Sequence, residues 1–349
     1  MAQGRRAMRW PPLTGNRRAT GAEVDRHKFG VLIHCITNKV CGTMTGWKKW
    51  GGRAALSAMV LIAPASASAD TPFITDNPSA CSLAEKAKAD ALLSVPFRVV
   101  DGRIYVDVLV NGDGPFTFAV DTGASGFGRA DAGLVAKLGL QIAGSGETSD
   151  GVATARVDTV RLASLDLGGF VRRNLEVVTR DYSSKMSREA AFAGIIGRDF
   201  FADGLLVIDY PGRRLTFSHR SGLAGGEQGV VAYERPFRVP VTIGTVSAEG
   251  NLDTGANVSL VLPKTLFDRV GGGKIEAAGD GRLTNTIVKT GSARLAGPVR
   301  IGAAILPDLT VRVSETYPEL LVGAHVLEHF TLLIDQRSRN VALCGRNAR

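Results

Sequence analysis

Two copies of the tetrapeptide Asp-Thr-Gly-Ala are the residues of this chain best suited to chemistry. They span Asp121 to Ala124 and Asp253 to Ala256. Each copy follows an apolar run typical of a β-strand, so each Asp is expected where a strand leaves its sheet. A carboxylate followed by Gly at such a point is accessible and tightly turned. Two such turns predict two similar lobes that each supply one carboxylate to a shared site.

The expected chemistry is hydrolysis by an activated water. Two carboxylates about 3 Å apart cannot both ionise, so Asp121 and Asp253 would share one proton. One carboxylate would take a proton from a water held between them, while the protonated partner hydrogen-bonds to the substrate carbonyl. The product would be a tetrahedral diol without a covalent enzyme intermediate. This chemistry needs no metal and no organic cofactor.

The residues that follow each Asp are suited to support such a pair. The Thr hydroxyls could brace the opposite turn, and the Gly residues permit tight turns whose backbone N–H groups face the carboxylates. The next polar residue differs between the copies, so we expect the two carboxylates to be non-equivalent. The supporting residues are Thr122, Gly123 and Ser125 in the first copy, and Thr254, Gly255 and Asn257 in the second.

A second repeated segment indicates that the chain is a duplication. Gly197–Asp209 aligns without gaps on Gly323–Asp335, and two apolar residues precede each of these Gly residues. The quartets Pro96–Val99 and Pro236–Val239 also match. The predicted boundaries are an N-terminal lobe at 93–220, a Gly-rich linker at 221–230 and a C-terminal lobe at 231–349.

These motifs resemble those of the aspartic peptidases of the pepsin and retropepsin type, and most closely a bacterial, secreted, two-lobe retropepsin-like aspartyl protease. The resemblance covers Val95 to Cys344. It implies an all-β fold with short helices, in which two homologous lobes enclose a cleft. It also implies an endopeptidase that binds extended peptides. A complete dyad in one chain needs no second subunit, so we expect a monomer.

The resemblance assigns roles residue by residue. Asp121 and Asp253 would be the catalytic dyad, and Thr122 and Thr254 a hydroxyl grip. The Asp-Thr-Gly turns would pack against two loops. A β-hairpin flap would cover the cleft, and the best candidate is 148–154. The loop residues are Ile196, Gly197, Val322 and Gly323, and the bend of the flap is Asp150 and Gly151.

The net charge of +9 does not indicate a nucleic-acid partner. Residues 1–69 contain 11 Lys and Arg but only 2 Asp and Glu, so they account for the whole excess. The same segment is typical of a secretory signal: Lys48, Lys49 and Arg53 precede an apolar run from Ala54 to Ala63, and cleavage is expected after Ala69. That run is too short to span a bilayer. Met44 to Ala69 therefore predicts a periplasmic or secreted protein without a membrane span after cleavage.

Two Cys residues remain after the predicted cut, Cys81 and Cys344. In an oxidising compartment two remaining thiols favour a disulfide. The alternative is two buried free thiols. Residues 70–92 predict either a small N-terminal helix or a prosegment, because Leu and Ala recur at helical spacing from Ser82 to Ser94.

Two other functions remain open. The first is a pseudoprotease that keeps the fold and binds peptides without cutting them. The second is a zinc peptidase, since His325, Glu328 and His329 fit an H-x-x-E-H pattern. The zinc hypothesis lacks an evident third ligand, because the residues after His329 contain Asp335 and no Glu. Asp335 itself aligns with Asp209 of the first repeat, which favours a structural role.

Overall fold

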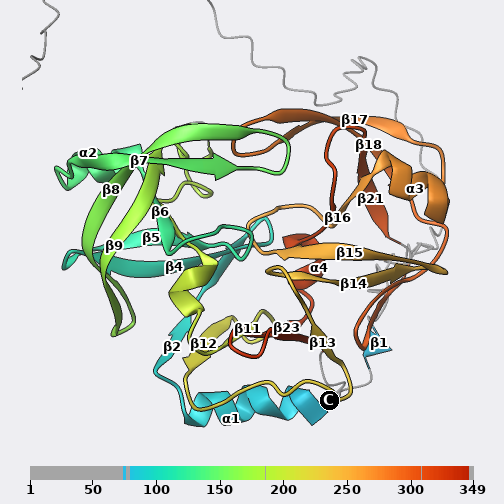
Figure 1. The fold of residues 1–349 in the computed structure, drawn as a ribbon, viewed down its shortest axis with the longest axis horizontal. Coiled ribbons are helices and arrows are strands. Elements are labelled where there is room, and N and C mark those ends of the chain that lie inside the picture. Colours follow the sequence, from blue (N-terminus) through green and yellow to red (C-terminus); the bar gives the residue numbers. More distant parts are fainter. Residues whose placement is uncertain (1–73, 76–78, 185, 308, 346–349) are drawn as a thin grey trace, which may run out of the picture. The chain divides into compact units, whose positions relative to one another are not determined.

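The structure is a computed structural model that describes residues 74–75, 79–184, 186–307 and 309–345. The predicted signal peptide and its cleavage site lie outside the described residues. Three β-sheets dominate the fold (Figure 1). The helices are short: η1 (Ser79–Ser82), α1 (Leu83–Ala89), α2 (Ala132–Lys137), η2 (Arg198–Phe201), α3 (Lys264–Val270) and α4 (Ala324–Leu327). The predicted all-β fold with short helices is confirmed.

One eight-stranded sheet comes from the first half of the chain. In spatial order its strands are β3 (Arg98–Val100), β4 (Arg103–Val110), β5 (Asp113–Val120), β10 (Gly194–Ile196), β6 (Gly128–Asp131), β9 (Phe170–Arg180), β8 (Thr154–Leu167) and β7 (Ile142–Ser149). Strands β4 and β8 also pair, so the sheet curves back on itself.

A ten-stranded sheet contains most of the second half. In spatial order its strands are β1 (Ile74–Thr75), β20 (Ala304–Leu306), β19 (Val299–Ile301), β14 (Arg238–Ile243), β15 (Val246–Asp253), β22 (Leu320–Gly323), β16 (Leu260–Pro263), β21 (Thr310–Ser314), β18 (Ile287–Arg294) and β17 (Glu276–Arg282).

The two sheets share a seven-strand order. It runs β4-β5-β10-β6-β9-β8-β7 in the first and β14-β15-β22-β16-β21-β18-β17 in the second. Strand directions agree as well: β5 is parallel to β10 as β15 is to β22, and β6 is parallel to β9 as β16 is to β21. The two halves therefore have equivalent strands that place equivalent residues.

The third sheet joins the halves, since each half supplies three of its strands. In spatial order they are β13 (Val230–Ala232), β24 (Asn340–Cys344), β23 (Thr331–Asp335), β11 (Leu205–Asp209), β12 (Arg214–Ser218) and β2 (Leu93–Pro96). The central pair is antiparallel, with Val207 opposite Leu333. Because these two residues are equivalent in the repeat, the third sheet is symmetric about its central pair of strands.

One sequence match does not correspond to structural equivalence. Pro236–Val239 enters β14, which pairs with the Asp-bearing strand, whereas Pro96–Val99 enters β3, outside the shared order. The true partner of Phe97 is Tyr233, because their backbone N–H groups donate to Arg213 and Arg339, which are equivalent in the repeat. The two quartets are similar in sequence because both lead into a strand and are flanked by apolar residues.

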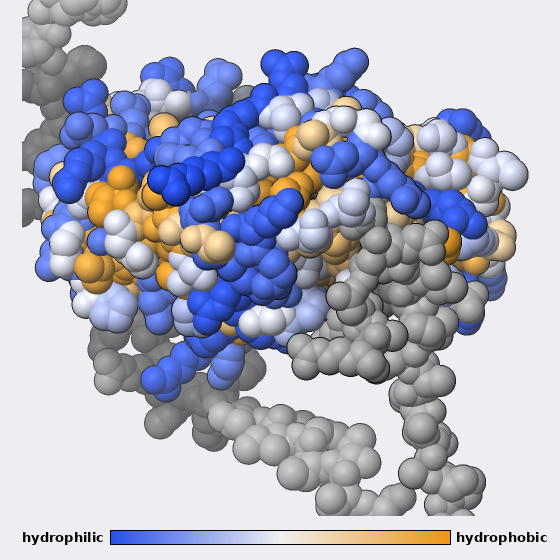
Figure 2. Space-filling view, turned by 90° about the horizontal axis from the view of Figure 1, so that it is seen from below, coloured by the Kyte–Doolittle hydropathy of each residue, from blue (hydrophilic) through white to orange (hydrophobic). Residues whose placement is uncertain are grey.

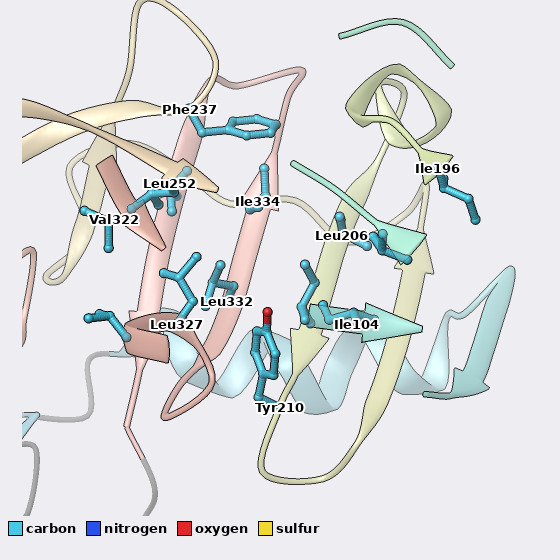
Figure 3. Packing of buried hydrophobic residues seen from close by; sticks show 14 of the residues in the cluster. Ile104, Ile196, Leu206, Tyr210, Phe237, Leu252, Val322, Leu327, Leu332 and Ile334 are labelled. Carbon is cyan, nitrogen blue, oxygen red and sulfur yellow. The ribbon is translucent and has the colours of Figure 1, made fainter. Parts of the chain in front are cut away.

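The buried core is shared by both halves. Ile104, Leu206 and Tyr210 of the first half lie in the same cluster as Leu252 and Leu332 of the second (Figure 3). In β4 the cluster contains the alternate residues Ile104, Val106, Val108 and Val110, whose side chains therefore point to one face of the sheet. The residues between them point to the opposite face of the sheet, which is the face that carries Asp121.

Helix α1 packs beneath the third sheet (Figure 1). Ala80 and Ala87 are buried against Val207 and Leu333, and a disulfide joins Cys81 to Cys344 of β24. In the view from below, hydrophilic residues are interspersed with smaller apolar areas (Figure 2). Within the predicted 70–92 segment, residues 79–89 are helical and are held covalently to the third sheet.

Candidate active site

Each Asp-Thr-Gly turn begins where a strand of the shared order ends. Asp121 follows β5 directly, and its backbone N–H donates to Ile196 of β10 at 3.0 Å. Asp253 is the last residue of β15 and lies opposite Gly323 of β22. In both halves a parallel neighbouring strand therefore fixes the point at which the carboxylate leaves the sheet.

The two carboxylates meet across the halves. A Cβ atom placed on Gly123 would lie 2.5 Å from Oδ2 of Asp253, and one placed on Gly255 would lie 2.5 Å from Oδ2 of Asp121. Each carboxylate therefore rests on the Gly of the opposite turn, where any side chain would collide. The Asp121 carboxyl group is close enough to Asp253 to raise the pKa of Asp253 through its charge and through hydrogen bonding.

This arrangement favours a shared proton. Burial raises the pKa of Asp253 well above its ordinary value, and the negative charge of Asp121 raises it further. A hydrogen bond from the Gly255 backbone N–H acts in the opposite direction but is outweighed. The protonated form of Asp253 is thus favoured beside Asp121, as expected for two adjacent carboxyl groups.

The two Thr residues form a reciprocal set of four buried hydrogen bonds. The Thr122 hydroxyl donates to the Leu252 carbonyl at 3.0 Å and accepts from the Thr254 N–H at 3.0 Å. The Thr254 hydroxyl donates to the Val120 carbonyl at 2.8 Å and accepts from the Thr122 N–H at 3.1 Å. Both side chains are buried, at 2% and 0% exposure. The bonds tie the ends of the two Asp-bearing strands together.

The backbone holds the two carboxylates differently. Oδ1 of Asp121 accepts a hydrogen bond from the Ala124 N–H at 3.0 Å, whereas Oδ1 of Asp253 accepts one from the Gly255 N–H at 2.8 Å. The donor is therefore three residues on in one turn and two residues on in the other. This difference in backbone donors makes the two carboxylates non-equivalent. From the sequence we expected non-equivalence but attributed it to the side chains of Ser125 and Asn257.

Ser125 and Asn257 lie elsewhere than we expected. Ser125 is exposed, and its hydroxyl is 3.5 Å from a guanidinium nitrogen of Arg129. Asn257 donates to Asp101 at 2.5 Å and accepts from Arg103 at 2.9 Å. Among the described contacts neither side chain donates to the dyad, because charged neighbours from the surrounding elements engage both.

A cross-half cluster supports the second turn, and sequence reasoning missed it. Arg103 Nε donates to the Gly255 carbonyl at 2.6 Å, and Asp101 accepts from Asn257 and lies 2.9 Å from Nε2 of His325. The hydrogen bond from Asn257 lowers the pKa of Asp101, although partial burial opposes this. Asp101 precedes Gly102 in the turn between β3 and β4, and no local signal links it to the second half.

The predicted supporting loops pack directly against the Asp-Thr-Gly turns. A Cβ on Gly197 would lie 2.4 Å from the Gly126 carbonyl oxygen, and one on Gly323 would lie 2.2 Å from that of Val258. The residues after these Gly residues donate backbone N–H groups to Ala124 and Ala256 at 3.0 and 2.7 Å. Ile196 and Val322 are fully buried beneath them. These close approaches explain why Gly is needed at both positions.

The flap candidate at 148–154 is the bend of the β7–β8 hairpin, and it has a counterpart. The β17–β18 hairpin brings Asn285 to it: the Asn285 N–H donates to Asp150 at 2.7 Å, and the side-chain amide donates to the Thr148 and Ala153 carbonyls at 2.8 and 3.0 Å. Arg180 donates to Oδ1 of Asn285 at 2.7 Å. The two hairpin tips therefore touch, and the second tip was not predicted.

The structure does not support the zinc hypothesis. Helix α4 ends at Leu327, so His325 and His329 do not share the face of one continuous helix. His325 is paired with Asp101. Among the residues that the structure describes, no group of three His, Cys, Asp or Glu is arranged to hold a metal ion.

Comparison with known proteins agrees with this site. Residues 106–200 match a family model described as aspartyl protease. The matched region contains Asp121, its turn and Gly197. The match supports an aspartyl protease family and aspartic protease function in general. It ends before Asp253, so the assignment of the second turn depends on the shared strand order. No curated protein matches the chain.

Proposed function

We propose that this chain is an aspartic endopeptidase with two homologous lobes, in which Asp121 and Asp253 activate a water between them. The observation that supports this most directly is the contact of the two carboxyl groups, each resting on the Gly of the opposite turn. Two independent structural turns would have no reason to place their carboxylates face to face. Doing so costs free energy, since like charges repel and burial disfavours both.

The proposed mechanism follows from the shared proton. The ionised carboxylate takes a proton from the bound water, and the protonated carboxyl group, favoured on Asp253, donates to the scissile carbonyl oxygen. The water oxygen adds to the carbonyl carbon, and the resulting diol then breaks its C–N bond as the nitrogen is protonated. The four Thr hydrogen bonds keep the carboxyl groups in place through both steps.

The substrate of the proposed enzyme is an extended peptide lying beneath the two hairpin tips. We propose a monomer that uses neither metal nor organic cofactor, because both carboxylates come from one chain. We also propose a periplasmic or secreted location, which the Cys81–Cys344 disulfide supports since such bonds persist in oxidising compartments. Among the described residues, no helix is long and apolar enough to cross a membrane.

The test is cleavage of a peptide library between pH 3 and 7, a range in which carboxyl dyads titrate. We expect wild-type protein to cut, and Asp121→Asn and Asp253→Asn to lower kcat by on the order of 10²–10⁴. The control is Asp113→Asn, which changes an exposed carboxylate of β5 and should retain full activity. Peptides that bind but stay intact with wild-type protein would identify a pseudoprotease instead.

A further inference from the structure

The face of the second sheet that carries Asp253 also carries charged residues. Alternate residues of a strand share a face, so Glu249 and Asn251 of β15 point to the same side as Asp253. Asn251 lies opposite Arg238 of β14 and Leu321 of β22. The residues flanking Asp253 on this face are therefore mostly polar.

Two ion pairs cross this face. Arg238 Nη2 lies 2.5 and 2.6 Å from the two carboxylate oxygens of Glu319, and Arg235 Nη2 lies 2.6 Å from Glu249. The Arg238 and Glu319 side chains are only 21% and 29% exposed. These four residues line a cavity of about 280 Å³ together with Arg269. Three guanidinium groups against two carboxylates leave the cavity with an excess of positive charge.

On the equivalent face of the first half the positions nearest the dyad are uncharged, although Arg98 lies 5.9 Å from the centroid of the Tyr105 ring. The shared strand order makes Ala119 the counterpart of Asn251, and Ala119 lies opposite Tyr105 and Ile195, the counterparts of Arg238 and Leu321. Tyr105 and Ala119 form a buried cluster with Phe192, against which Tyr182 and Ile195 pack. The ring centroids of Tyr105 and Tyr182 lie 6.3 and 6.2 Å from that of Phe192.

Tyr317 connects the charged face to the dyad and the first hairpin tip. A Cβ on Gly151 would lie 3.7 Å from its ring, and the ring is almost fully buried. Burial raises the pKa of Tyr317, and the negative charges of Asp253 and Glu319 raise it further, whereas Arg238 opposes them. The hairpin tip approaches Tyr317, and Glu319 of the ion pair lies two residues further along the chain, so the pair lies on the part of the second half that faces the first hairpin tip.

Building on the proposed peptidase function, we propose that the two walls select different side chains on the two sides of the scissile bond. The wall formed by Arg235, Arg238, Arg269 and their Glu partners takes an acidic side chain. The opposite wall, where Tyr182 and Ile195 are partly buried over the cluster of Tyr105 and Phe192, takes an aromatic or aliphatic one. Acidic residues are favoured over basic ones because both Glu residues already accept from Arg, while no ion pair of Arg269 occurs among the described residues.

The experiment profiles cleavage with a library randomised on both sides of the bond, followed by matched peptides that differ only by Glu or Gln at the selected position. For wild-type protein we expect kcat/KM to be about tenfold higher for Glu, the equivalent of ~1.4 kcal/mol. Arg269→Gln should reduce this ratio by lowering kcat/KM for the Glu peptide more than for the Gln peptide. The double variant Arg238→Gln/Glu319→Gln removes the partly buried pair without leaving an unpaired charge, and should also reduce the ratio.

The control is Arg300→Gln, which removes an exposed charge on β19 and should leave the ratio unchanged. Equal cleavage of the Glu and Gln peptides, or a preference for Lys, would overturn the inference while leaving the peptidase function intact. If wild-type protein cuts no peptide, the proposed function fails, and the same peptides then test the wall by fluorescence-polarisation binding. Tighter binding of the Glu peptide that Arg269→Gln abolishes would support the wall, and equal binding would reject it.

Discussion

At the scale of single residues, the dyad is a costly arrangement that the surrounding groups hold in place. Asp253 is buried beside a second carboxylate, and both effects raise its pKa. A group whose proton is held more tightly in the folded than in the unfolded protein loses stabilising free energy as pH rises. The buried carboxyl pair therefore lowers the free energy of unfolding at neutral pH relative to acidic pH.

This predicts a pH-dependent gain in stability for Asp253→Asn. Asn cannot ionise, so the variant avoids the cost of charging Asp253 in the folded protein. This cost in folding free energy is absent below the ordinary pKa of Asp. It grows as the pH rises from the ordinary pKa to the raised pKa of Asp253, by ~1.4 kcal/mol for each pH unit between the two pKa values. The measurement is urea unfolding between about pH 3.5 and 8, the range between the ordinary and the raised pKa. The free energy of unfolding of Asp253→Asn should rise relative to that of wild type as the pH increases.

The control for that measurement is Asp113→Asn, because Asp113 is exposed at the start of β5. Its free energy of unfolding should follow that of wild type across the range. A constant difference between Asp253→Asn and wild type at all pH values would contradict the raised pKa.

At the scale of elements, the two hairpins are joined at their tips. Their tips have exposed apolar residues, Val152 and Ile287, and contact each other through a few polar groups. Partial burial acts to raise the pKa of Asp150, but the backbone N–H groups of Ala153, Asn285 and Val152 outweigh it and lower the pKa. The contact between the tips is thus an interaction of an ionised Asp150 with backbone donors.

We predict that Asn285→Ala loosens this contact. The substitution removes two side-chain donors and the acceptor of Arg180 while keeping the backbone N–H bond to Asp150. A loss of about 1–2 kcal/mol should speed amide hydrogen exchange at 150–153 by roughly 5–30-fold. Thr284→Ala is the matched control, since Arg180 contacts Thr284 through its backbone carbonyl. Unchanged exchange in Asn285→Ala would show that the side chain does not hold the tips.

At the scale of the whole molecule, the halves are joined by the third sheet, the Thr bonds and a covalent link. The Cys81–Cys344 disulfide closes a loop with a sequence separation of 263. It connects η1, which precedes α1 and the first half, to β24, the last strand of the second half. A long closed loop restricts the unfolded chain strongly in the chain-entropy model.

We therefore expect Cys81→Ser/Cys344→Ser to lower the free energy of unfolding by about 3–5 kcal/mol. Thermal unfolding of the oxidised wild-type protein and the double variant gives the difference. Wild-type protein treated with a reductant is the internal control and should approach the variant. Equal stability of oxidised protein and variant would show that α1 and the third sheet hold together without the bond.

The sequence alone determined the parts of the site that repeat. Both Asp-Thr-Gly turns and both supporting Gly residues are visible as motifs, because tight turns and close backbone approaches demand specific residue types. The same logic revealed the all-β class. The match between the quartets at Pro96 and Pro236 wrongly indicated equivalent positions. Such short sequences with apolar flanks are common at the start of strands and do not show which strands pair.

Only the tertiary structure decided how the two halves differ. Arg103 reaches Gly255, Asn285 reaches the opposite hairpin, and Arg238 pairs with Glu319 over Asn251. These contacts join residues far apart in the chain, and their geometry depends on how the strands pair and how the sheets are brought together. Local sequence records what a residue can do, whereas the fold determines which partner it meets.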